Sequence, residues 1–119
     1  LKVVEPGRLY LSGMPTPAGL AVAHRRHGFR TIINLFPEDT PQRSPHYPAE
    51  RAFARDHGIR YLEATGEAAE SDDFLDRTLA VARDPGCWPV LIHCHGAMDR
   101  TPAWLGIYRF VVQGRPLAE

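Results

Sequence analysis

A cysteine and an arginine separated by five residues are the side chains of this sequence best suited to covalent chemistry. Cys94 directly follows an apolar run, and Arg100 comes just before a helical segment. A tight loop between a strand end and a helix N-terminus can point successive backbone N–H groups inward, which makes a nest for a tetrahedral anion. The same surroundings lower the pKa of a cysteine thiol, so that thiolate exists at neutral pH. The spacing therefore predicts a thiolate at Cys94 that accepts a phosphoryl group.

The other residues of this loop are expected to hold the phosphate. Arg100 can clamp two phosphate oxygens at once, which a lysine cannot do equivalently. A metal site is not expected, because consecutive His93, Cys94 and His95 send their side chains in divergent directions and no distant cysteine pair adds ligands. The sequence therefore predicts neither a metal nor a cofactor. The predicted phosphate-binding residues are His95, Gly96, Ala97, Met98, Asp99 and Arg100.

The segment from His93 to Thr101 resembles the signature of the Cys-dependent protein tyrosine phosphatases, which is His-Cys, five residues, Arg, then Ser or Thr. Residues 6–13 and 31–35 look like matching segments of the small dual-specificity phosphatases, so the resemblance covers most of the chain. It implies hydrolysis of a phosphate monoester through a phosphocysteine intermediate. The roles it implies are nucleophile for Cys94, phosphate ligand for Arg100, assistance to the thiolate and to breakdown of the intermediate for Thr101, and support of the loop for His93.

A general acid must protonate the leaving oxygen, because an alkoxide or phenoxide leaves poorly. Asp99 is the first candidate. Its place directly before Arg100 resembles the myotubularin lipid phosphatases and certain bacterial phosphatases, in which this aspartate has been assigned the acid role. Most family members use a separate loop, which here would be residues 63–73, and Glu67 and Asp72 are the alternatives on it.

Two departures from the family pattern leave other functions open. The family usually has glycine three residues after the cysteine and two after the arginine, where this chain has Ala97 and Pro102. If residue 97 needs a positive φ, alanine costs roughly 1 kcal/mol against glycine. One alternative is therefore a non-catalytic phosphate-binding module, a pseudophosphatase. A rhodanese-like sulfurtransferase is a second, against which Arg100 followed by Thr101 argues.

Composition limits the partners. Fourteen Lys and Arg balance fourteen Asp and Glu, so the net charge is zero and no basic excess points to nucleic acid. The sequence contains no run of 18 apolar residues, so no integral membrane segment is predicted. The resemblance implies a phosphorylated protein, a phosphoinositide or another phosphorylated small molecule as substrate, and the neutral charge weighs mildly against strongly anionic polyphosphates.

Cys87 and Cys94 are too few for a disulfide framework, which predicts free thiols and a cytoplasmic protein, although a leader cleaved before residue 1 remains compatible with the sequence.

The elements that must position the loop alternate along the chain. The length of 119 residues and the ordinary composition predict a single domain over residues 1–119, phosphatase-like by the resemblance. Alternating strands and helices predict an α/β fold, a mostly parallel sheet of about four strands flanked by helices on both faces, which the resemblance makes dual-specificity phosphatase-like. Ligands of such sheets bind beyond the carboxyl ends of the strands, which points to the turn after His93. The predicted strands are 8–12, 30–35, 59–63 and 89–93, and the helices are 18–27, 48–57, 71 or 72 to about 84, and 102–113.

Local signals mark where these elements begin and end. Thr16 is predicted to cap the first helix, and Gly28 and Gly58 to end the first two helices in the left-handed conformation. The two glycines lie in the same kind of helix-to-strand joint, His-Gly-apolar-Arg, used twice. Along the last helix, Trp104, Tyr108 and Val111 recur at helical spacing and are predicted to lie in the core.

Overall fold

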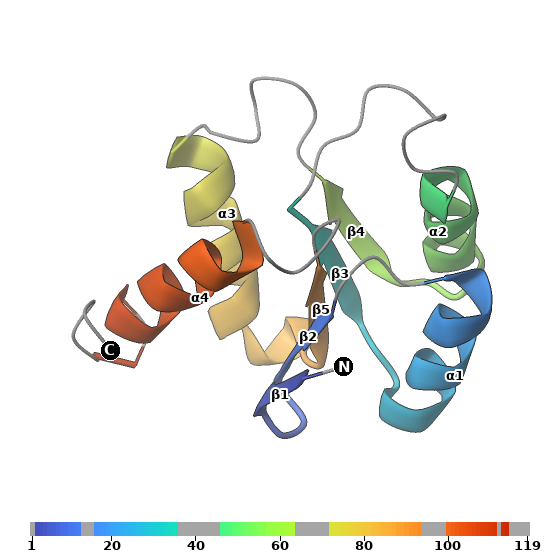
Figure 1. Ribbon diagram of the computed structural model, residues 1–119, viewed down its shortest axis with the longest axis horizontal. Coiled ribbons are helices and arrows are strands. Elements are labelled where there is room, and N and C mark those ends of the chain that lie inside the picture. Colours follow the sequence, from blue (N-terminus) through green and yellow to red (C-terminus); the bar gives the residue numbers. More distant parts are fainter. Residues whose placement is uncertain are drawn as a thin grey trace.

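A five-stranded sheet with the order β1-β2-β5-β3-β4 lies at the centre of the molecule (Figure 1). The computed structural model describes residues 2–12, 16–35, 46–63, 72–93, 100–111 and 113–114. Strand β1 pairs antiparallel with β2, and the other neighbouring strands are parallel. The strands are β1 Lys2–Glu5, β2 Leu9–Ser12, β3 Thr31–Asn34, β4 Arg60–Glu63 and β5 Val90–His93, and the helices are α1 Pro17–His27, α2 His46–Asp56, α3 Asp72–Arg83 and α4 Arg100–Val111, with a short 3-10 helix, η2, at Pro85–Cys87.

The predicted α/β class is confirmed, and all four predicted strands are present as β2 to β5. Strand β1 was not predicted. It carries no apolar alternation and its first half is exposed, so only its pairing with β2 through a turn at Gly7, with φ of 76°, makes it a strand. Helices α2 and α4 each begin two residues earlier than predicted, at His46 and Arg100. None of the described helices is long and apolar enough to cross a membrane.

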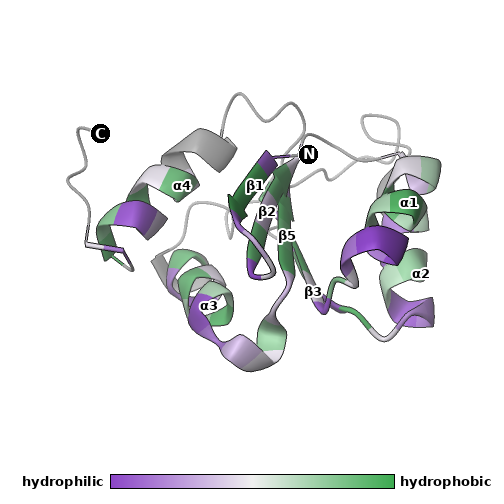
Figure 2. Cartoon of the chain, turned by 90° about the horizontal axis from the view of Figure 1, so that it is seen from below, coloured by the Kyte–Doolittle hydropathy of each residue, from purple (hydrophilic) through white to green (hydrophobic). Residues whose placement is uncertain are grey.

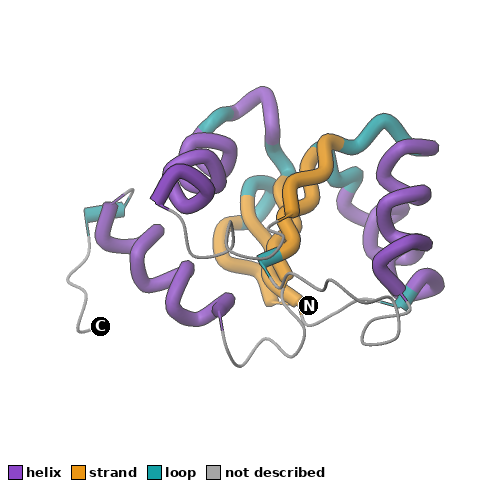
Figure 3. The backbone as a smooth tube through the Cα atoms, turned by 90° about the horizontal axis from the view of Figure 1, so that it is seen from above, coloured by secondary structure: helices purple, strands orange, loops and turns teal. Residues whose placement is uncertain are grey.

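Helices cover both faces of the sheet. Figures 1 and 3 show α1 and α2 against one face and α3 and α4 against the other. Each face has its own core cluster, and Figure 2 shows the strands between them as mostly hydrophobic. In β5, Val90 and Ile92 join the cluster beneath α3 and α4, whereas Leu91 joins the one beneath α1 and α2. His93 continues the alternation of Leu91 and therefore lies on the side of α1 and α2.

The predicted caps are present. Thr16 accepts a hydrogen bond at its Oγ1 from the backbone N–H of Gly19, at 3.0 Å. Gly28 and Gly58 both have φ of 66°, in the left-handed region that glycine adopts without strain. The two helix-to-strand joints are therefore built in the same way.

Helix α4 is held to the sheet by an aromatic face. Trp104 and Tyr108 are buried and stack with ring centroids 5.3 Å apart, as predicted for core residues. The indole N–H of Trp104 donates to the hydroxyl of Thr78 on α3 at 2.9 Å, which joins the two helices of this face. Val111 is half exposed, so its predicted place in the core is wrong; it lies in the last turn of α4.

Candidate functional site

Polar residues end the four parallel strands in one row at the carboxyl edge of the sheet. In the parallel register, His93 lies level with Ser12 on one side and with Asn34 on the other. Glu63 ends β4 level with Asn34. The carbonyl of His93 accepts a hydrogen bond from the N–H of Leu35 at 2.8 Å, so the central strand stays hydrogen-bonded to its end. The last residue of β5 is therefore fixed from both sides.

The side chain of His93 is fully buried and paired with a carboxylate. Its Nε2 lies 2.5 Å from Oε1 of Glu50, which is 3% exposed and comes from α2. An ionised carboxylate only accepts hydrogen bonds, so with Glu50 ionised the donor of this contact is Nε2. The contact is a short hydrogen bond between two groups that water does not reach.

Tyr61 and Asn34 lie next to this pair. Asn34 donates through Nδ2 to the Tyr61 hydroxyl at 3.3 Å. Burial, and after it the nearby carboxylate of Glu50, raises the pKa of Tyr61 above its ordinary value. The Tyr61 hydroxyl therefore stays protonated near neutral pH.

The position of α2 is set by an ion pair beside Glu50. The guanidinium of Arg51 donates two hydrogen bonds to the carboxylate of Glu63 at the end of β4, from Nε to Oε1 at 2.8 Å and from Nη2 to Oε2 at 3.0 Å. This two-point contact fixes distance and direction. It holds the helix so that Arg51 stays outside while Glu50, one residue before it, faces the sheet.

The described residues frame the predicted loop. β5 ends at His93 and α4 begins at Arg100, with Thr101 in its first turn. Figure 1 shows α4 starting on the side of the sheet where the parallel strands end. Asp72 is the first residue of α3. The side chains of Arg100, Thr101 and Asp72 are not described. The predicted site residues Cys94, His95, Gly96, Ala97, Met98, Asp99 and Glu67 lie outside the described residues.

Glu50 is the site residue that sequence reasoning missed. The prediction for this helix gave only its range and no role to Glu50, whereas the structure buries Glu50 and leaves the neighbouring Ala49 exposed. The signal was present, because Glu50 lies three and four residues before Phe53 and Ala54 and so shares their face. A charged residue on the apolar face of a helix indicates a buried partner.

The second cysteine lies away from this edge. Cys87 is buried in η2, before the amino end of β5, where its Sγ contacts Arg60 and Asp84 at 3.6 Å each. Cys87 is a free thiol, as predicted, and its burial keeps it from reacting readily. Across the part of the chain that the structure describes, no three His, Cys, Asp or Glu side chains come together as metal ligands.

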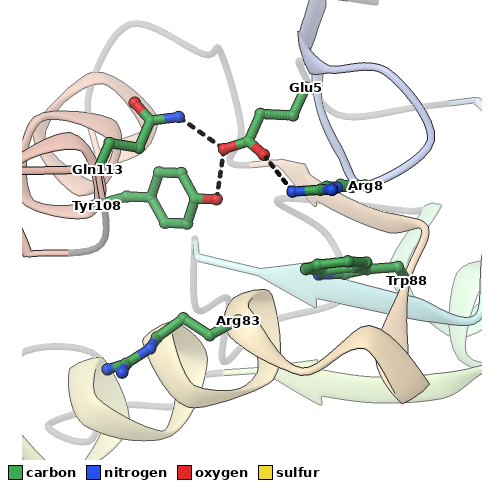
Figure 4. A pocket seen from close by; sticks show the side chains of 6 residues that line it. All are labelled: Glu5, Arg8, Arg83, Trp88, Tyr108 and Gln113. Atoms are coloured by element: carbon green, nitrogen blue, oxygen red, sulfur yellow. Dashed lines mark hydrogen bonds and ion pairs between the residues drawn. The ribbon is translucent and has the colours of Figure 1, made fainter.

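A polar cavity of about 440 Å³ lies at the opposite end of the sheet (Figure 4). Glu5 at its wall accepts hydrogen bonds from the Tyr108 hydroxyl at 2.7 Å and from Nε2 of Gln113 at 2.6 Å. Arg8 pairs with the same carboxylate at 3.7 Å and lies over the ring of Trp88. Through the hydrogen bonds of Glu5 to Tyr108 and Gln113, the cluster ties β1 to α4 and the residues that follow it.

Comparison with known proteins agrees with this framework. A family model described as "Tyrosine phosphatase family" matches residues 2–115. Inositol diphosphatase SIW14 of Saccharomyces cerevisiae is 27% identical over 110 residues, which cover 87% of this chain and 37% of that protein. Dual specificity protein phosphatase TpbA of Pseudomonas aeruginosa is 29% identical over 110 residues, which cover 89% of this chain and 44% of that protein. The chain thus spans less than half the length of these curated relatives.

Solved structures of the same two proteins have the same fold. The core catalytic domain of SIW14 superposes with a TM-score of 0.72 at 26% identity, covering 94% of this chain and 66% of that one. TpbA superposes with a TM-score of 0.68 at 26% identity, covering 94% of this chain and 63% of that one.

Proposed function

Because the chain belongs to the tyrosine phosphatase family, we propose that it hydrolyses phosphate monoesters through a phosphocysteine intermediate. One observation carries the proposal: β5 ends at His93 and α4 begins at Arg100, so Cys94 and the five residues after it join a buried strand to a helix N-terminus. That connection is where a parallel α/β sheet binds its ligands. It is also where backbone N–H groups and the helix dipole favour an anion.

The proposed reaction has two steps. The thiolate of Cys94 attacks phosphorus in line while Arg100 and the loop amides hold the equatorial oxygens. The bond from phosphorus to the ester oxygen breaks as Asp99 gives that oxygen its proton. Water then attacks the phosphocysteine, Asp99 takes the proton of the water, and the S–P bond breaks to return the thiolate. Thr101 assists this second step through its hydroxyl. No metal or cofactor takes part.

The substrate is proposed as a class. The names of the two relatives divide between an inositol diphosphatase and a dual-specificity protein phosphatase. We therefore propose a phosphorylated protein, a phosphoinositide or another phosphorylated small molecule. A reducing compartment such as the cytoplasm would keep Cys94 as a thiol. Comparing a phosphotyrosine peptide with a phosphoinositide would separate the substrate classes, and hydrolysis of an inositol pyrophosphate, which is an anhydride, would extend the proposal beyond monoesters.

The first test is hydrolysis of p-nitrophenyl phosphate in reductant and EDTA across about pH 5 to 8, a range that brackets thiolate and acid titrations. We expect activity that survives chelation and falls by about a thousandfold or more in Cys94→Ser, because the nucleophile is lost. Cys87→Ser is the matched control and should keep full activity.

Two other outcomes would replace the proposal. A folded protein that binds vanadate but turns nothing over would be a phosphate-binding module. Transfer of sulfur from thiosulfate to cyanide, without phosphatase activity, would identify a sulfurtransferase.

A further inference from the structure

We propose that Glu50 is a positioning residue for this reaction, which holds the ring of His93 so that the ring supports the loop beginning at Cys94. The inference rests on the proposed function and deepens it. The structure brings Glu50 to His93 from α2, 43 residues away in sequence.

The geometry leaves the His93 ring one orientation. The backbone of His93 is fixed in the central strand, level with Ser12 and Asn34. At the side chain, Nε2 is committed to Oε1 of Glu50 at 2.5 Å. A ring fixed at its backbone and at its far nitrogen cannot rotate without breaking a buried hydrogen bond.

The other ring nitrogen remains for the loop. Nδ1 of His93 is buried and has no hydrogen-bond partner among the residues described. A buried ring nitrogen left unpaired is costly, and His93 is followed directly by Cys94. With the proton on Nε2, Nδ1 can accept a hydrogen bond from the loop. Glu50 thus decides which face and which tautomer of the ring the loop meets.

Stability alone does not account for the pair. Both side chains have left water, and the second carboxylate oxygen of Glu50, Oε2, is buried without a hydrogen-bond partner in the described parts of the chain. Well-packed apolar residues in place of a buried ion pair are often neutral or stabilising. A carboxylate on the buried face of α2, one turn before Phe53 and Ala54, points to a role beyond packing.

The test uses Glu50→Gln, which keeps the shape and removes the charge. Cys94 is alkylated with iodoacetamide over a range of pH, and its peptide is quantified separately from that of Cys87 by mass spectrometry. We expect the alkylation rate near neutral pH to fall about tenfold, since a misplaced loop stabilises the thiolate less. We expect kcat to fall by a similar factor while KM changes less than about threefold. Glu5→Gln, a hydrogen-bonded carboxylate at the other end of the sheet, is the matched control and should change neither.

A double variant tests that Glu50 acts through His93. Changing both to Gln should cost little more than changing one, because the second change removes a contact already lost. A Glu50→Gln protein that is less stable but has the wild-type alkylation curve would overturn the proposal. If the wild type hydrolyses nothing yet its Cys94 reactivity depends on Glu50, the proposed function fails while the positioning role stands.

A measurement on the wild type makes the proposal independent of how the variants fold. Nitrogen-15 shifts of the His93 ring should show a proton on Nε2, the nitrogen that contacts Glu50. The Nδ1 resonance should move when Cys94 is alkylated. A ring that carries no proton on Nε2 would contradict the assignment.

Discussion

Asp99 directly precedes Arg100, and the proposed mechanism gives its carboxyl group the proton that the leaving oxygen takes up. Asp99→Asn removes that proton and should lower kcat about a hundredfold for an alkyl phosphate. The loss should be smaller for p-nitrophenyl phosphate, because p-nitrophenolate leaves without help. The pH profile should also lose its alkaline limb, which reports deprotonation of the acid.

Steady-state kinetics on both substrates would check this, with Glu67→Gln and Asp72→Asn as matched carboxyl-to-amide controls. A wild-type profile in Asp99→Asn, together with a large loss in one of the controls, would assign the acid role to the residue changed in that control.

At the scale of elements, α1 meets the turn that follows α2 through a pair of histidine rings. The rings of His24 and His57 lie 5.3 Å apart. Burial, and then the charge of His57, lowers the pKa of His24 below its ordinary value of 6.5. The folded protein therefore holds this proton less tightly than the unfolded chain, so stability is full above 6.5 and is lost as the pH falls below it. Urea midpoints should fall more steeply between about pH 7 and 5 in the wild type than in His24→Phe.

His57→Gln serves as the partner variant and should remove the part of the slope that comes from repulsion between the rings. Equal slopes in the wild type and His24→Phe would show that this contact carries none of the acid sensitivity.

The two helix-to-strand joints make a second prediction at this scale. Gly28 and Gly58 have positive φ with open space where a Cβ would stand, so Ala at either site is strained by its backbone alone. Each substitution should lower the free energy of unfolding by about 1 kcal/mol. Gly106→Ala in α4 is the control: its Cβ also meets open space but its backbone is helical, and it should gain up to about 1 kcal/mol. Chemical denaturation would measure all three, and similar signs at Gly58 and Gly106 would contradict the argument.

At the scale of the whole molecule, one end of the sheet carries the proposed site and the other end carries a cluster that contributes to stability. The carboxyl ends hold His93 and its pair with Glu50, and the opposite end holds the cluster in which Glu5 bonds Tyr108 and Gln113. Glu5→Gln weakens charge-assisted bonds and should cost about 1 kcal/mol of stability. It should leave kcat/KM unchanged, because Glu5 lies at the end of the sheet opposite to His93. Thermal unfolding and steady-state kinetics on one preparation would check both, and a loss of kcat/KM without loss of stability would show that the ends are coupled.

The sequence by itself determined the order and type of the strands and helices from β2 onward. Apolar runs, Thr16, Gly28 and Gly58 act within a few residues of themselves, so their effects are local and readable along the chain. For the candidate site, the spacing of Cys94 and Arg100 predicts a phosphate-binding loop, and this stays a prediction that the proposed assays test.

Only the tertiary structure decided the features that depend on contacts between residues far apart in the sequence. It made Lys2–Glu5 an edge strand, placed β5 between β2 and β3, and brought Glu50 to His93. A local pattern states that a helix has an apolar face but not which strand that face meets. A buried carboxylate needs a partner, because burying an unpaired charge costs a large free energy. Which residue becomes that partner depends on the register of the whole sheet.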